Sequence, residues 1–173
     1  MNSTAKVQPP PQQASVRSIT PCLTFKDQAE EAVNFYVSVF RDARIVSLVR
    51  SDRDGPVPKG KVLNVAFELG GQRYTAFDGG AHFQFTDGFS LMATCDTQEE
   101  LDRVWHTLSS DGGREIECGW LKDRFGVSWQ VVPASLMEMM AHPERGNVHK
   151  LLEAVWSMVK LDVKALETAY LQS

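Results

Sequence analysis

The side chains best able to do chemistry gather around one alternating stretch in the C-terminal half of the chain. Val127 to Val132 alternates residue by residue after a polar turn, and Pro133 removes the next backbone donor. Because successive side chains of a strand point to opposite faces, Gln130 lies on the face opposite the aromatic Trp129. Such a strand typically divides a helix-packed core from a cavity. The pattern predicts that Gln130 orients a ligand, or alternatively that its amide pairs with a neighbouring strand or side chain.

Three further side chains are candidates for the same cavity. Asn64 shares one face of a predicted strand with Glu68, which is expected to be solvated. His82 lies in the connector between the two halves of the chain, where an imidazole can contact a ligand, transfer a proton near neutral pH, or simply be exposed. Trp120 is expected to line the pocket or to cover its rim.

Composition limits the partners and the location. The 173 residues are enough for one domain with a core or for two small fused modules. A net charge of -4 and the absence of a Lys/Arg run argue against nucleic-acid binding. No apolar run approaches the roughly 20 residues that cross a bilayer. Residues 1–18 are a Pro/Gln-rich lead, expected to be disordered and without the apolar centre of a secretory signal, so the expected location is cytoplasmic.

The three cysteines do not form a recognisable framework. Cys22, Cys95 and Cys118 are an odd number without a CxxC spacing, which argues against a zinc pattern or a disulfide set. Reduced thiols are therefore expected. A reactive Cys118, in a probable loop beside a glycine, is the alternative.

The first half of the chain predicts a β-α-β-β-β unit. Asp27 is expected to cap a helix with Glu30 as its reciprocal partner, and apolar residues follow at the spacing of one buried helix face. Gly70 and Gly71 can take the positive φ angles of a tight hairpin. The expected strands cover residues 19–25, 44–50, 61–69 and 72–78.

The second half repeats the same order of elements. Asp96 and Glu99 stand 69 residues after Asp27 and Glu30 (96 − 27 = 69, 99 − 30 = 69), and the apolar face of the second helix has the same offset. The expected strands cover residues 90–95, 115–118, 120–122 and 127–132. The predicted fold class is α+β, with two βαβββ modules at residues 19–80 and 88–134 of one domain, 19–134.

Residues 135–173 are expected to form a helical extension. Ser135 and Glu138 offer another capping box, and the methionine cluster at 137–140 is typical of adaptable core or interface packing. An amphipathic helix is expected from Val148 onward. These helices have one apolar side each, so they must pack on the back of a sheet or on a neighbouring subunit.

The chain resembles a known family in four stretches, CGWLKDRFGVSWQVVP, FDGGAHFQF, CDTQEELDRVW and MVKLDVKALETAY. It is similar to the PhnB-like branch of the glyoxalase/bleomycin resistance/dioxygenase (vicinal oxygen chelate, VOC) superfamily. That branch is often labelled 3-demethylubiquinone-9 3-methyltransferase domain. The resemblance runs from residue 19 to the C-terminus. It implies two modules whose curved sheets line a cavity, commonly in a homodimer that can exchange modules.

The resemblance also implies where a metal would be held. In the superfamily, His, Glu or Gln from the first and fourth strands of each module bind a divalent metal. Here Gln130 matches the usual Glu position of the last strand. The first strand of the second module offers Ser90 at the ligand position. The first module offers Pro21 or Cys22 and Phe77 or Asp78. One amide with at most one carboxylate or thiol does not make a metal site, so a divalent metal is possible but not favoured. Asp78 and Ser90 remain candidate ligand contacts.

The resulting hypothesis is a homodimeric protein that binds a small molecule in the cavity between its modules, without a conventional metal site. The first alternative is an enzyme of the glyoxalase or dioxygenase type, which needs a converged acid/base or metal pair. The second alternative is methyl transfer, as the family label says. A methyl donor normally binds at a glycine-rich loop that follows a parallel strand, whereas Gly70-Gly71 and Gly79-Gly80 are glycines of a hairpin and a connector. The third alternative is a structural dimer whose cavity is filled by side chains. Whether the protein is an enzyme stays open at this stage.

Overall fold

The computed structural model describes residues 15–80 and 83–172, which form two similar modules followed by three helices. The first module consists of β1 (Cys22–Phe25), α1 (Ala29–Val39), β2 (Ala43–Arg50), β3 (Val62–Leu69) and β4 (Gln72–Asp78). The second consists of β5 (Leu91–Cys95), α2 (Gln98–Ser109), β6 (Arg114–Glu115), β7 (Trp120–Lys122) and β8 (Ser128–Pro133). The predicted α+β class with two βαβββ modules is confirmed.

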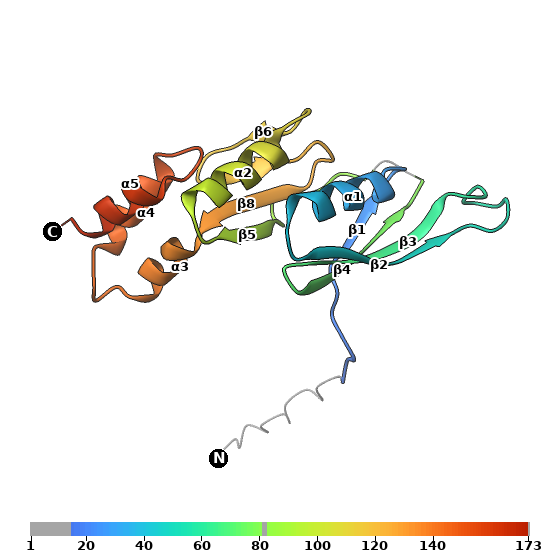
Figure 1. Cartoon of the computed structure of the whole chain (residues 1–173), viewed down its shortest axis with the longest axis horizontal. Helices are drawn as coiled ribbons and strands as arrows, with labels where there is room; N and C mark the ends of the chain where they lie inside the picture. The colour runs from blue at the N-terminus through green and yellow to red at the C-terminus, as the bar shows by residue number, and fades with distance from the viewer. Residues whose placement is uncertain (1–14, 81–82, 173) are drawn as a thin grey trace, which may run out of the picture.

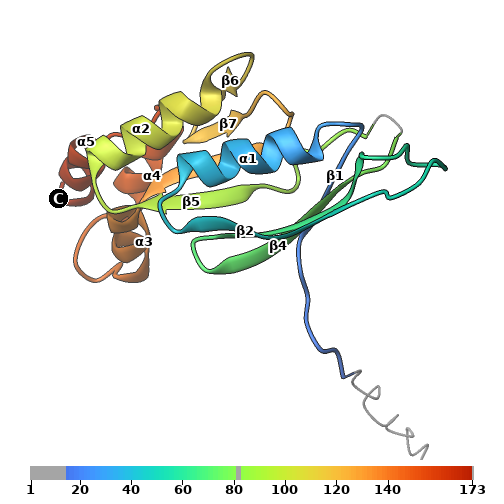
Figure 2. The same ribbon diagram turned by 45° about the vertical axis from the view of Figure 1, so that its right-hand side comes forward.

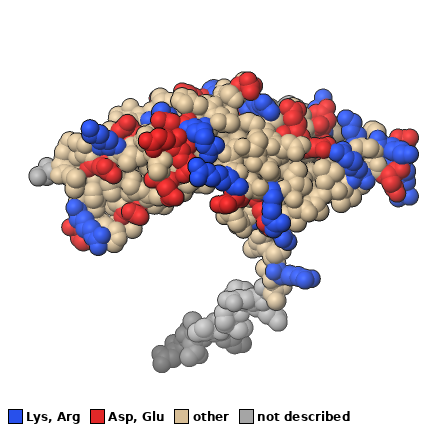
Figure 3. All heavy atoms as spheres, in the orientation of Figure 1, with Lys and Arg blue, Asp and Glu red and all other residues tan. Residues whose placement is uncertain are grey.

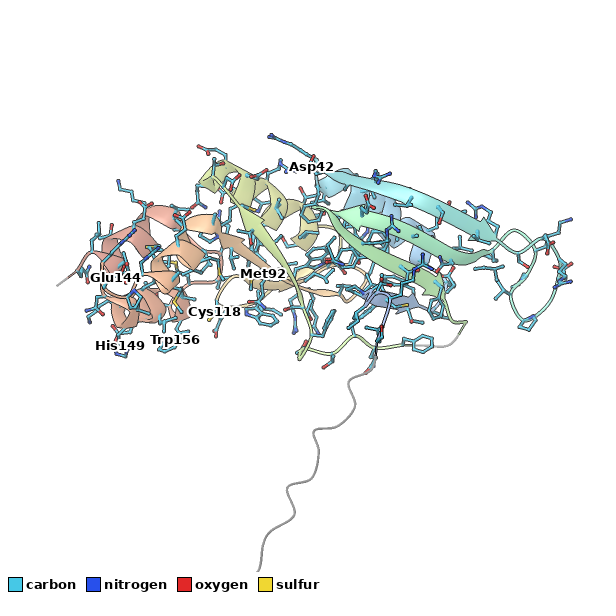
Figure 4. The ribbon with its side chains drawn as sticks, turned by 90° about the horizontal axis from the view of Figure 1, so that it is seen from below. Asp42, Met92, Cys118, Glu144, His149 and Trp156 are labelled. Carbon is cyan, nitrogen blue, oxygen red and sulfur yellow. The ribbon has the colours of Figure 1, made fainter. Side chains whose placement is uncertain are left out.

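Each module has a four-stranded sheet with the same topology. The strand orders are β1-β4-β3-β2 and β5-β8-β7-β6, and in both sheets the first strand pairs in parallel with the last. Figures 1 and 2 show α1 and α2 on the same side of the two sheets. The opposite faces of both sheets therefore look to a common side of the molecule, which Figure 4 shows from below.

The hairpin between β3 and β4 forms as the sequence predicts. Gly70 and Gly71 have φ angles of 53° and 79°, a pair of left-handed conformations that residues with a Cβ rarely adopt. The turn fixes the register in which Leu69 pairs with Gln72. That register places Val65 and Phe67, both 0% exposed, on the face that packs against α1.

The predicted cap of the first helix is wrong. Asp27 does not cap α1, which begins at Ala29 without a side-chain hydrogen bond from its N-cap residue. Instead the Ala29 N–H donates to Oδ1 of Asp78 at 2.8 Å. The parallel pairing of β1 with β4 brings this carboxylate to the helix N-terminus, a long-range effect that local spacing does not contain.

Two other predicted caps are also wrong. In α2 the cap is Thr97 rather than Asp96, and the Thr97 hydroxyl accepts from the Glu100 N–H at 3.2 Å. The helix α3 (Ala134–Ala141) follows β8 directly, with Pro133 at its N-cap position and no side-chain cap. The Ser135 hydroxyl is buried there without a hydrogen-bond partner among the described residues.

The two modules are joined by a buried carboxylate. Asp123, in the turn before β8, is 3% exposed and accepts from the Tyr36 hydroxyl of α1 at 2.8 Å and from Trp129 Nε1 at 2.9 Å. Its other oxygen accepts the N–H groups of Phe125 and Val127 at 2.8 and 3.0 Å. One carboxylate thus satisfies four donors and fixes α1 of the first module against the second sheet.

The C-terminal helices pack against the second module (Figure 1). After α3 come α4 (Val148–Trp156) and α5 (Val163–Tyr170). The segment between α4 and α5 runs beside the residues before β7, because the N–H groups of Cys118 and Gly119 donate to the carbonyls of Met158 and Val159. The amphipathic helix predicted from Val148 is confirmed.

The charges on the surface and the lengths of the helices complete the description of the fold. Basic and acidic side chains lie intermixed on the face shown in Figure 3 rather than separated by sign. Within the part of the chain that the structure describes, no helix has the length and apolar character needed to span a membrane.

Candidate functional site

The second sheet carries a row of side chains on the face that its helix leaves open. Trp129 and Val131 of β8 are 2% and 0% exposed because they point to the helix side, so Gln130 points to the other face. In register, Gln130 pairs with Met92 of β5 on one side and with Trp120 of β7 on the other. These three side chains therefore form one row across three strands, which we call the Gln130 row. Met92 is labelled on this face in Figure 4.

The Gln130 amide is oriented by a neighbouring hydroxyl. Its Nε2 donates to Oγ of Ser90 at 2.8 Å, which leaves the amide oxygen as an acceptor without a described protein donor. The structure thus brings together three of the residues selected from sequence: Gln130, Ser90 and Trp120. The alternative that Gln130 pairs with another side chain is confirmed, and its amide oxygen remains available at the half-open face.

The first sheet has an open face of the same kind. Cys22 pairs with Thr75, and the side chains of Thr75 and Phe77 lie on the open face of β4 as Gln130 lies on that of β8. That Phe77 matches Gln130 stays a prediction, whereas Asp78 lies on the opposite face of β4, where its carboxylate caps α1. Asn64 lies near Thr75, whose hydroxyl donates to the Asn64 amide oxygen at 2.5 Å.

Two predicted site residues, Asp78 and Asn64, lie apart from this group. Asp78 pairs with the buried Phe25 and caps α1 with its carboxylate, so it lies on the helix side of the first sheet. Asn64 is half-buried on the first sheet, not on the second, so it does not share a row with Gln130. A third predicted residue, His82, lies outside the described residues.

A cleft of about 440 Å³ lies between the two modules. Its lining comes from the α1–β2 turn, the β3–β4 hairpin, β5 and α2. The aromatic side chains Phe40, Tyr74 and Trp129 line it together with Met92. Because Met92 also belongs to the Gln130 row, the cleft and the row are adjacent. Cavities of this volume accommodate small organic molecules.

The side chains at the positions of the superfamily's metal ligands do not fit a divalent metal. The positions that the resemblance implies carry Ser90 with Gln130 in the second module and Pro21 or Cys22 with Phe77 or Asp78 in the first, where the Asp78 carboxylate already caps α1. A divalent metal needs several converging imidazole, carboxylate or thiolate ligands, and these positions do not supply them. Among the described residues, no group of three or more His, Cys, Asp or Glu side chains is arranged to hold a metal ion.

The thiols differ in accessibility, which gives a first testable prediction. Burial raises the pKa of the Cys95 thiol to about 11, with a further contribution from the nearby Glu100 carboxylate. At pH 8 only about one in a thousand such thiols is ionised, so we expect iodoacetamide to leave Cys95 unmodified in the folded protein. Cys22 is exposed and is expected to react first. Peptide mapping after a timed reaction measures both, and fast labelling of Cys95 without unfolding would contradict the packing described above.

The comparisons with known proteins agree with this fold. The family described as 3-demethylubiquinone-9 3-methyltransferase matches residues 17–132. A PhnB protein from Bacillus cereus, to which the same methyltransferase description is provisionally given, is 40% identical with a TM-score of 0.64. The alignment covers 68% of this chain and 100% of that protein. No curated protein matches the sequence significantly.

More distant structures share the fold alone. Protein PA1353 from Pseudomonas aeruginosa is 23% identical with a TM-score of 0.57, over 68% of this chain and 98% of its own. The fosfomycin resistance protein FosX from Mesorhizobium loti is 15% identical with a TM-score of 0.51, over 73% of this chain and 99% of its own. The family match ends at residue 132, so α3, α4 and α5 lie outside it.

Proposed function

Because the chain belongs to the PhnB-like 3-demethylubiquinone-9 3-methyltransferase family and has the VOC fold, we propose that it binds a small molecule at the Gln130 row. The observation that carries this proposal is the adjacency of the row to the cleft between the modules, through Met92. The aromatic and thioether side chains of the cleft suit an apolar body. The free oxygen of the Gln130 amide suits a donor on the ligand.

We also propose that the open face is covered by a second copy of the chain. Two large apolar side chains that Figure 4 labels on this side are strongly exposed in the single chain: Met92 is 50% exposed and Trp156 59%. Monomeric proteins rarely leave many such side chains together on one side. A homodimer that buries this side would close the space over the Gln130 row.

The family name does not by itself assign methyl transfer to this chain. Nucleotide-type donors bind at a glycine-rich turn between a parallel strand and its helix. The corresponding turns here are residues 26–28 and 96–97, and neither contains a glycine. The proposal is therefore binding in a site with neutral polar groups, and the reaction, if any, depends on the ligand.

Substitution of Gln130 tests the proposal. A thermal-shift screen of small organic molecules identifies ligands that raise the melting temperature by mass action. We expect Gln130→Ala to weaken their binding by about tenfold, because one buried hydrogen bond is lost. Met92→Arg is expected to abolish binding, because the longer charged side chain extends over the row and into the cleft mouth. Isothermal titration calorimetry measures both effects.

The matched control is Gln172→Ala, which makes the same change at an exposed site after α5. It is expected to leave every dissociation constant unchanged. Equal affinity in wild type, Gln130→Ala and Met92→Arg would place the ligand elsewhere and would overturn the proposed site.

A further inference from the structure

One buried hydroxyl on the open face has no hydrogen-bond partner among the described residues. Ser128 is 2% exposed, and its Oγ makes no hydrogen bond to the described chain. Its side chain points to the same face as Gln130, because the intervening Trp129 packs against Tyr36 on the helix side with ring centroids 5.4 Å apart. Buried hydroxyls are nearly always satisfied, so an unsatisfied one at this place requires an explanation.

Two further donors flank Ser128 on the neighbouring strands. Lys122 of β7 pairs with it directly. On the other side of Ser128 lies β5, which runs parallel to β8 and pairs Leu91 with Trp129. The preceding residues of the two strands, Ser90 and Ser128, therefore lie side by side. Adjacent strands lie about 4.8 Å apart, so several of these groups can share one oxygen-bearing group above the sheet. We call Ser90, Ser128 and Lys122 the hydroxyl–lysine row.

A carboxylate of the chain already lies against this row. The Lys122 ammonium contacts Oδ1 of Asp87 at 2.6 Å, and Asp87 belongs to the connector before β5. The hydrogen bond from Lys122 and its positive charge lower the pKa of the Asp87 carboxyl. The Lys122 side chain is 24% exposed and Asp87 77%, so the carboxylate reaches the lysine from the solvent side. An exposed ion pair of this kind is weak and exchangeable.

We propose that the hydroxyl–lysine row is an anion subsite that binds a carboxylate or phosphate group of the ligand in place of the Asp87 carboxylate. The inference rests on the proposed function, since it places the anionic end of the same ligand. Hydroxyl and ammonium donors around one oxyanion form charge-assisted hydrogen bonds, which are stronger than neutral ones. The anion would also give the Ser128 hydroxyl the acceptor that the described chain does not supply.

The spacing of the rows defines the ligand. The hydroxyl–lysine row lies two residues along the strands from the Gln130 row, a distance of about 7 Å. Ser90 links the rows, because it accepts the hydrogen bond from Gln130. The ligand class is therefore a small organic acid or organic phosphate that carries a hydrogen-bond donor close to its anionic group, with its apolar body toward the cleft.

A charged and a neutral probe of the same shape test this subsite. Benzoate and benzamide differ in charge but hardly in size, and calorimetry at low ionic strength compares their dissociation constants. We expect wild type to bind benzoate at least about tenfold more tightly than benzamide, and Lys122→Met to remove that preference. The control is Lys160→Met, which breaks another Lys–Asp ion pair, with Asp102, away from the row.

Two further variants separate binding from folding. Ser128→Ala removes an unsatisfied buried hydroxyl, so it is expected to leave the melting temperature equal or higher while it weakens benzoate binding by several fold. Asp87→Asn removes the competing carboxylate and is expected to strengthen benzoate binding by several fold. A merely structural role for the row predicts the opposite pattern, with Ser128→Ala less stable and affinities unchanged.

The outcomes distinguish this inference from the function on which it rests. If benzamide and benzoate bind equally and Met92→Arg rejects both, the site stands and the anion subsite is wrong. If benzoate binds neither wild type nor Asp87→Asn, the subsite is also wrong, whereas neutral ligands that Met92→Arg rejects would still support the site. Inorganic phosphate is the third probe: competition with benzoate supports a free or organic phosphate, and no competition restricts the ligand to a carboxylate.

Discussion

Replacing Asp123 with alanine is expected to lower the free energy of unfolding by about 3–5 kcal/mol, one of the two largest effects of any single substitution considered for this chain. The carboxylate accepts four hydrogen bonds at 3% exposure. Its removal leaves the Tyr36 hydroxyl, the Trp129 indole and two backbone N–H groups without acceptors. Urea unfolding followed by tryptophan fluorescence measures the change.

A series of variants isolates the link between the modules. Tyr36→Phe removes only the donor from α1 and is expected to cost about 1–2 kcal/mol. Asp52→Ala is the matched control, because that carboxylate is exposed in a loop, and its effect is expected to stay within about 0.5 kcal/mol. If Asp123→Ala were no more destabilising than Asp52→Ala, the carboxylate would not hold the modules together.

The buried carboxylate also predicts a dependence on pH. Burial raises the pKa of the Asp123 carboxyl, against the lowering effect of its four hydrogen bonds. The folded state therefore binds this proton more tightly than the unfolded state, and the stabilising contribution declines as pH rises through the folded pKa. Asparagine does not titrate. The difference in unfolding free energy between wild type and Asp123→Asn should thus be larger in mild acid than at neutral pH.

Leu161→Ala is expected to destabilise the protein by about 2–4 kcal/mol, although the residue lies outside the family match. Leu161 is 0% exposed between α4 and α5, and its carbonyl accepts from Nε2 of Gln98 in α2 at 3.2 Å. The extension therefore shares the core of the second module. Val159→Ala is the control, because Val159 is 45% exposed and its truncation should cost less than about 0.5 kcal/mol. Thermal unfolding measures the loss of stability in each variant, and a single transition in both makes the two values comparable. Equal losses for Leu161→Ala and Val159→Ala would show that the extension packs loosely.

The sequence predicted the modules because their signals are local. The alternation of β8, the glycine pair of the first hairpin and the repeated helix faces depend on spacing alone. Capping was predicted less well, since Asp78 reaches the N-terminus of α1 from a strand 49 residues away. Only the parallel pairing of β1 with β4 makes that contact possible.

The candidate site was likewise predicted where its signals are local and missed where they depend on contacts between strands. Gln130 was found from alternation, whereas its neighbours depend on strand register, which no local pattern supplies. Met92 lies within a predicted strand, but its pairing with Gln130 and its place at the cleft emerged only from the fold. Ser128 could have been noticed, because it alternates with Gln130 on the same face. Its missing partner is a property of the packed structure.

An NMR titration with the first ligand from the thermal-shift screen tests the Gln130 site most directly. We expect the side-chain amide of Gln130, the indole N–H of Trp120 and the methyl of Met92 to shift together and to saturate at one dissociation constant. Shifts confined instead to the shallow surface hollow near residues 144–148 and 170–172, with the Gln130 amide unchanged, would contradict it.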